Sequence, residues 1–155
     1  MLRELKDMLG HYSITKFKSF TGTDGLGFNA TLLKDGKKVC FVIDEGCGGC
    51  MHFDFTSREE QQAFEAHVAM IEKSEFEPCD MFMHKAIDLF ETQRSIVRRA
   101  KRKTCYLASG DPFKTERGWE FRILDEPFSP TVRERVVAHF MKKGQSVRFL
   151  NEEVA

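Results

Sequence analysis

Two cysteines and a histidine lie within six residues of one glycine-rich stretch. Cys47 and Cys50 are separated by two glycines, and His52 follows two residues later. Thiolate and imidazole groups are ligands that zinc prefers, and a loop with several glycines can wrap around a tetrahedral ion. The candidates for a fourth ligand are Cys40, Cys79, His67 and His84. Structural zinc sites usually contain two regularly spaced ligand pairs, which Cys79 and His84 do not form. Zinc binding is therefore an alternative to a simple glycine turn with two thiols.

The same residues provide little basis for catalysis. A redox-active C-x-x-C motif places its first thiol at a helix N-terminus, whereas Cys50 leads into residues 51–55, which alternate like a strand. His52 and Asp54 share one face of that strand, and Asp44 and Glu45 precede the loop, so an acid–base cluster is conceivable. Alternating polar residues on a wet strand face are the simpler explanation. The G-x-S-x-G, H-E-x-x-H and zinc-deaminase signatures are absent from the sequence. We therefore expect a protein that is not an enzyme.

The most distinctive charge feature is a run of six cations, within ten residues that contain no acid. This basic ridge consists of Arg94, Arg98, Arg99, Lys101, Arg102 and Lys103. On a helix, Arg94, Arg98 and either Lys101 or Arg102 fall on one side, because residues three and four positions apart are neighbours. The ridge is a candidate surface for phosphates or for an acidic face of a partner protein. The alternative is a solvated helix end whose cations complement the helix dipole.

Length, charge and aromatic content limit the kinds of fold and partner that are compatible with these residues. The chain has 155 residues and no net charge at pH 7, with 15 Phe against two Tyr and one Trp. This length predicts a single domain, residues 1–155, whose core is built from large apolar rings. A neutral chain has no overall field that would steer it to nucleic acid or to a membrane, so any such binding must come from a local patch.

The sequence also indicates a cellular compartment. The chain has five cysteines, an odd number, and its first ten residues form a short charged segment without an apolar signal core. No apolar run approaches the roughly 20 residues needed to span a bilayer. We therefore expect a cytoplasmic protein with reduced thiols and no membrane partner.

Hydrophobic periodicity and turn residues predict the elements that position these groups. We expect helices at residues 2–9, 57–73, 79–103 and 130–143, and strands at 14–20, 28–33, 39–44, 51–55, 104–109, 119–124 and 147–150. Asp35 and Gly36 favour a type I′ hairpin. The glycine-rich residues 21–27 are followed by a strand instead of a helix, which favours a wide turn over a phosphate-binding loop. This order of elements predicts an α+β fold, a mainly antiparallel sheet with about three main helices covering it.

The first third of the chain resembles small bacteriophage proteins. The residues that carry this resemblance are Phe17–Phe20, Asp24–Ala30, Asp35–Val39 and Gly48–Cys50. The chain is similar there to small proteins of unassigned function encoded by tailed bacteriophages and related mobile elements. The resemblance implies an accessory factor that binds a host protein or nucleic acid. We therefore expect a non-catalytic binding protein with a host protein as the first partner and nucleic acid as the second. A small zinc-binding protein is a further alternative.

Overall fold

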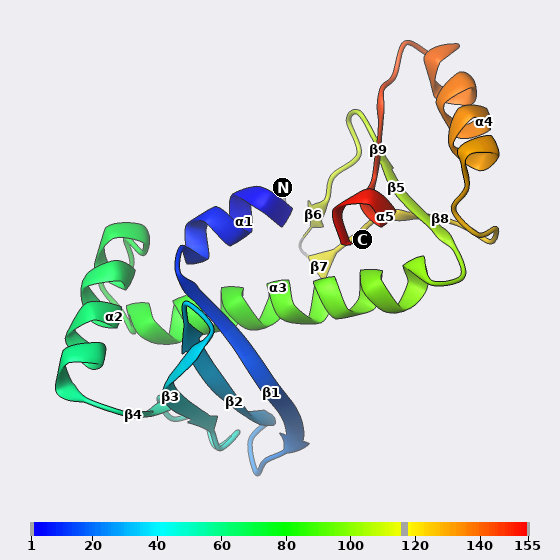
Figure 1. The fold of residues 1–155 in the computed structure, drawn as a ribbon. Helices are drawn as coiled ribbons and strands as arrows, with labels where there is room; N and C mark the ends of the chain where they lie inside the picture. The colour runs from blue at the N-terminus through cyan, green and yellow to red at the C-terminus, as the bar shows by residue number, and fades with distance from the viewer. Residues whose placement is uncertain (1, 116–117, 155) are drawn as a thin grey trace. The chain divides into compact units, whose positions relative to one another are not determined.

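The computed structural model describes residues 2–115 and 118–154. Contacts between residues divide the chain into two compact units. One is Arg3–Leu89, and the other runs from Phe90 onward and also includes Leu2. We call them the N-terminal and C-terminal units and describe each by itself. The expectation of a single domain stays a prediction. The α+β class is confirmed, because both units combine antiparallel strands with helices (Figure 1).

The N-terminal unit contains a four-stranded antiparallel sheet in the order β1-β2-β3-β4. After helix α1 (Leu2–Leu9), its strands are β1 (Tyr12–Thr21), β2 (Leu26–Lys34), β3 (Lys37–Asp44) and β4 (His52–Phe55). Asp35 and Gly36 have φ angles of 49° and 79°, which confirms the predicted type I′ turn between β2 and β3. Strand β3 lies between two partners, as expected for its nearly continuous apolar sequence.

Helices α2 (Arg58–Ile71) and α3 (Pro78–Ala100) follow the sheet. The Ser57 hydroxyl accepts a hydrogen bond from the Glu60 N–H, as the capping pattern predicts. Phe64 of α2 is fully buried in a cluster of rings. Its centroid lies 5.3 Å from those of Tyr12 and Phe82 and 5.6 Å from that of Phe55. This cluster holds the helices on the sheet.

Two glycine-rich loops pack backbone against backbone at one end of this sheet. Residues 22–25 connect β1 to β2, and residues 45–51 connect β3 to β4. The Asp24 N–H donates to the Gly46 carbonyl at 2.8 Å. A Cβ atom on Gly22 would lie only 2.4 Å from the Glu45 carbonyl oxygen. The loop at residues 21–27 is thus a turn between strands, as predicted, and its glycines allow this close approach.

The C-terminal unit contains a three-stranded antiparallel sheet in the order β8-β5-β9. Its elements are β5 (Thr104–Ala108), β6 (Lys114–Thr115), β7 (Gly118–Trp119), β8 (Arg122–Leu124), α4 (Pro130–Met141), β9 (Val147–Phe149) and α5 (Leu150–Val154). The predicted strand at residues 119–124 is two shorter strands. Strand β7 pairs with β6, and the Glu120 N–H donates a hydrogen bond to the Phe113 carbonyl. Glu120 and Phe121 therefore lie between β7 and β8 and belong to neither strand. The strands of the described residues therefore divide among separate sheets, and do not form the single sheet we expected.

Helix α4 begins as predicted, since the Ser129 hydroxyl accepts from the Val132 N–H and Pro130 occupies the first turn. Val132, Val136 and Phe140 pack with Ala108 and Phe149 of the sheet. This is the apolar face that the spacing of α4 predicts.

Asn151 ties the end of α3 to the start of β5. Its side-chain oxygen accepts from the Cys105 N–H at 2.7 Å. Its amide nitrogen donates to the carbonyls of Ala100 and Lys103, at 3.3 and 2.9 Å. The Ala100 carbonyl belongs to the last turn of α3, where backbone acceptors lack partners within the helix, and the Lys103 carbonyl lies in the turn that leads to β5. A buried amide thus fixes the helix end that carries the basic ridge.

Candidate partner-binding surface

The cysteine loop lies between β3 and β4, with both thiols exposed. The Cys50 thiol donates to Oε1 of Glu77 at 2.8 Å, whereas the Cys47 sulfur lies 3.9 Å from Oε2 of Glu45. Asp80, in the first turn of α3, accepts from the Met51 N–H at 2.9 Å. Carboxylates therefore lie around this loop: Glu45 belongs to the loop itself, and Glu77 and Asp80 approach it from the start of α3.

These carboxylates affect the chemistry of the thiol. The hydrogen bond to Glu77, together with the negative charge of that carboxylate, raises the pKa of Cys50. Burial raises the pKa of Cys40 to about 12 and that of Cys79 to about 11. Zinc ligation and nucleophilic attack both require the thiolate, which a raised pKa disfavours. The Cys50 environment therefore favours a protonated thiol at neutral pH.

The structure does not bring the proposed zinc ligands together. His52 is exposed on β4, where it pairs with Ile43. Over residues 2–115 and 118–154, no three His, Cys, Asp or Glu side chains form a group that could hold a metal ion. His67 lies in the ring cluster, 5.0 Å from Tyr12 between centroids, as expected of a core histidine, and His84 is exposed on α3. Zinc binding through Cys47, Cys50 and His52 stays a prediction.

Three of the six ridge cations line one groove on the C-terminal half of α3. The groove has a volume of about 390 Å³. It is lined by Phe90, Gln93, Arg94, Val97, Arg98 and Lys101, and we call it the α3 groove. The first five belong to α3 and Lys101 follows its last residue, with spacings of three and four residues that place them on one face of the helix. Its floor thus combines two apolar side chains with three cations.

The cations of the α3 groove have no acidic partners in the described part of the chain. Arg94, Arg98 and Lys101 are exposed, and none of them forms a salt bridge there. An exposed ion pair contributes little stability, so the fold loses little by leaving these three cations unpaired within the described residues. Their charges are therefore available to an external ligand.

The other ridge residues are arranged differently. The Arg99 guanidinium lies 5.9 Å from the centroid of the Phe121 ring, and Lys103 forms a 2.9 Å salt bridge with Asp125. Arg102 is exposed. The structure therefore separates the predicted ridge into three groove cations, two cations that contact residues on either side of β8, and the exposed Arg102. A cation near the C-terminus of a helix also complements the helix dipole. The positions of Arg99 and Lys103 therefore fit a structural role for these two cations.

Charge is distributed unequally between the two units. Residues 90–155 contain 14 Lys and Arg against nine Asp and Glu, whereas residues 1–89 contain 10 against 15. At pH 7 the C-terminal unit therefore has a net charge of +5 and the N-terminal unit a net charge of −5. The neutral chain is therefore polarised between its two units, and the α3 groove lies in the positive one.

The apolar part of the α3 groove is not expected from hydrophobicity alone. An apolar side chain on a helix normally faces the core, yet Val97 is 41% exposed. Phe90 is half-buried and lines the groove one turn before Arg94. The signal was present in the spacing, since Phe90, Arg94, Val97 and Lys101 follow one another at intervals of four, three and four residues.

Comparisons with known proteins add no relative. No protein-family model, curated protein or solved structure matches this chain. Among the helices of the described residues, none combines the length and the apolarity needed to cross a bilayer.

Proposed function

We propose that the protein is a non-catalytic binding protein of the host cytoplasm, a phage or mobile-element accessory factor that binds an acidic segment of a host protein through the α3 groove. The observation that carries this proposal is a set of three cations, without salt bridges among residues 2–115 and 118–154, beside Phe90 and Val97 on one face of α3. The resemblance to small phage proteins supplies the context. A host protein whose activity is inhibited or modulated by this contact fits that context.

The shape of the α3 groove suits a short amphipathic segment. From Phe90 to Lys101 the groove follows about three helical turns, or roughly 16 Å at 1.5 Å per residue. A partner segment of similar length can place apolar side chains on Val97 and Phe90 and carboxylates beside Arg94, Arg98 and Lys101. Such an arrangement is the common helix-in-groove mode of recognition.

Apolar contacts and charges have different roles in this proposal. An exposed ion pair contributes about 0.2–1 kcal/mol, so three pairs do not account for a stable complex. Affinity must come mainly from removing the apolar surface of Phe90 and Val97 from water. The cations would select an acidic partner and raise the association rate.

Nucleic acid is the second candidate. The observation in its favour is the half-buried Phe90 ring next to Arg94, since single-strand binders combine cations with aromatic stacking surfaces. Such binders usually present several exposed rings along the strand. Phe90 is the only ring among the residues that line this groove, which ranks nucleic acid below a protein partner.

An affinity pull-down from bacterial lysate, with and without nuclease, tests the proposal. The test variant reverses the groove cations (Arg94→Glu, Arg98→Glu, Lys101→Glu). A control variant makes the same charge change at exposed lysines outside the groove (Lys37→Glu, Lys73→Glu, Lys142→Glu). We expect a nuclease-resistant protein partner that the control retains and the test variant loses. Equal retention by the test variant would overturn the proposal, and loss of the partner after nuclease would favour nucleic acid.

A further inference from the structure

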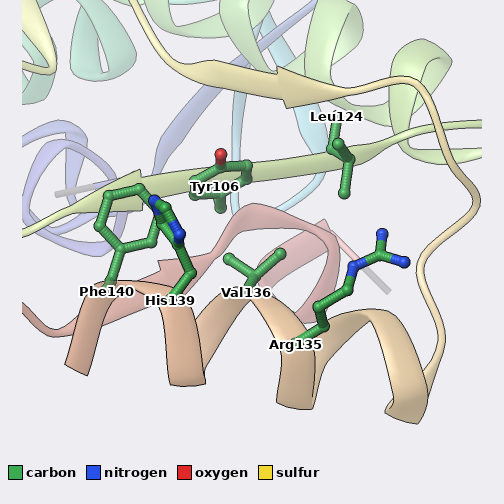
Figure 2. A pocket seen from close by; sticks show the side chains of 6 residues that line it. All are labelled: Tyr106, Leu124, Arg135, Val136, His139 and Phe140. Carbon is green, nitrogen blue, oxygen red and sulfur yellow. The ribbon is translucent and has the colours of Figure 1, made fainter. Parts of the chain in front are cut away.

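The C-terminal unit contains a second cavity, separate from the α3 groove, between α4 and the strands β5 and β8 (Figure 2). Its volume is about 290 Å³. It is lined by Tyr106, Leu124, Arg135, Val136, His139 and Phe140, and we call it the α4 cavity. Figure 2 shows the α4 side chains reaching toward the strands, with Tyr106 and Leu124 opposite them. None of these residues lines the α3 groove.

Aromatic rings form one side of the α4 cavity. The rings of Tyr106 and Phe140 meet nearly edge to face, with centroids 5.8 Å apart. His139 meets Phe140 in the same way at 5.1 Å. The branched side chains of Leu124 and Val136 complete the lining. Rings prefer offset or edge-to-face neighbours, so these walls suit a flat aromatic ligand.

Polar groups also line this cavity. Among the described residues, neither the Tyr106 hydroxyl nor the His139 ring nitrogens have a hydrogen-bond partner. One guanidinium nitrogen of Arg135 donates to Glu126 at 2.5 Å, which leaves its other N–H groups for a ligand. Such uncommitted donors can orient an acidic group.

Positive charge predominates at this cavity. The Arg122 guanidinium lies 5.3 Å from the Phe140 centroid and the Lys143 ammonium lies 5.6 Å from it. Asp111 neutralises Arg122 and Glu126 neutralises Arg135, whereas Lys143 has no salt bridge within the described residues. The field at the Phe140 ring therefore favours an anion over a cation.

The α4 cavity differs from a packing defect. Voids left by imperfect packing are closed and apolar. Here Arg135 and His139 are exposed, so the cavity opens to solvent on its polar side. Its volume of about 290 Å³ lies just below the range for drug-sized ligand sites, which is roughly 300–1,000 Å³. It can therefore hold one small ring system but no large cofactor.

We propose that the α4 cavity binds a small planar aromatic carboxylate. The ring of the ligand packs against the exposed surfaces of Tyr106, Phe140 and Leu124 that line the cavity, while its carboxylate accepts hydrogen bonds from Arg135 and His139. This second site does not depend on the proposed protein partner.

Titration of the ¹⁵N-labelled full chain with 2-naphthoate, followed by amide chemical shifts, tests the proposal. We expect saturable shifts concentrated at residues 106, 124 and 135–140, with a dissociation constant below about 1 mM. The neutral analogue 2-naphthamide should bind at least about tenfold more weakly, because it lacks the charge that Arg135 recognises. No saturable shifts, or equal binding of the two compounds, would overturn the proposal.

Variants separate this site from unspecific binding. Arg135→Gln should weaken 2-naphthoate binding about tenfold, whereas Arg133→Gln, on the same helix but outside the lining, should leave it unchanged. His139→Trp, at an exposed position, should block the entrance without altering the core. If 2-naphthoate bound His139→Trp and Arg135→Gln as tightly as the unchanged protein, the α4 cavity would not be its site.

Discussion

Replacing Gly46 with alanine should destabilise the N-terminal unit, because the new methyl group combines an unfavourable backbone conformation with a close approach to neighbouring backbone. Gly46 has a φ of 65°, which costs a residue with a Cβ atom about 1–2 kcal/mol. The new Cβ would also lie 2.7 Å from the backbone nitrogen of Gly27 and 2.9 Å from the carbonyl oxygen of Gly25. Backbone atoms cannot rotate away, so the two loops must separate, at a further cost of about 1–3 kcal/mol. The expected loss in the free energy of unfolding is about 2–5 kcal/mol.

Urea unfolding followed by circular dichroism measures this loss. Alanine substitutions at two other glycines separate the contribution of the backbone conformation from that of the steric overlap. Gly36 has a φ of 79° but open space around it, so Gly36→Ala should cost only about 1–2 kcal/mol. Gly22 is not in the left-handed region, yet its Cβ would lie 2.4 Å from the Glu45 carbonyl, so Gly22→Ala tests the overlap alone. If Gly46→Ala lost no more stability than Gly36→Ala, the two loops would not be packed as described.

Three further predictions concern ionisable groups and metal. Because Glu77 raises the pKa of Cys50, Glu77→Gln should lower that pKa and speed the alkylation of Cys50 by iodoacetamide at pH 8, measured by peptide mass spectrometry; an unchanged rate would contradict the contact. Hydrogen bonds from Arg122 lower the pKa of Asp111, so this carboxylate stabilises the fold above its unfolded pKa, and the stabilisation is lost as pH falls through the lower folded value. Asp111→Asn should therefore cost about 1 kcal/mol at pH 7 and progressively less below about pH 4, and a pH-independent difference in urea unfolding would refute this. Elemental analysis of protein purified without chelator should find no stoichiometric zinc, whereas one zinc per chain, lost with folding in Cys50→Ser or Cys47→Ser, would establish the structural-metal alternative.

Local signals in the sequence predict most elements. The Asp35–Gly36 turn, the Ser57 cap and the Ser129–Pro130 helix start each depend on residues within one turn of the chain, and the structure contains all three. The division of the strands among separate sheets depends on long-range pairing. Strand β5, for example, pairs with β9, about 40 residues later, and no local pattern specifies that partner.

The candidate partner-binding surface could also be predicted only in part, because some of its contacts are long-range. Helical spacing predicts that Arg94 and Arg98 share a face, and both line the α3 groove. It does not show that Arg99 lies over Phe121 or that Lys103 pairs with Asp125, because these partners lie about 22 residues away in the chain. An apolar residue such as Val97 is usually buried, and only the fold shows that it is exposed. The α4 cavity likewise requires the packing of α4 on β5 and β8.

Photo-crosslinking from the α3 groove tests the central proposal most directly. Val97 would be replaced with p-benzoylphenylalanine, and the variant irradiated in bacterial cells. The control carries the same residue in place of Met70, which is 77% exposed on α2. We predict a discrete, nuclease-resistant crosslink to a protein from position 97 that is absent from position 70 and is lost when Arg94 and Arg98 are changed to Glu. The proposal would be contradicted by crosslinking from position 97 that is no stronger than from position 70, or by crosslinks to nucleic acid alone.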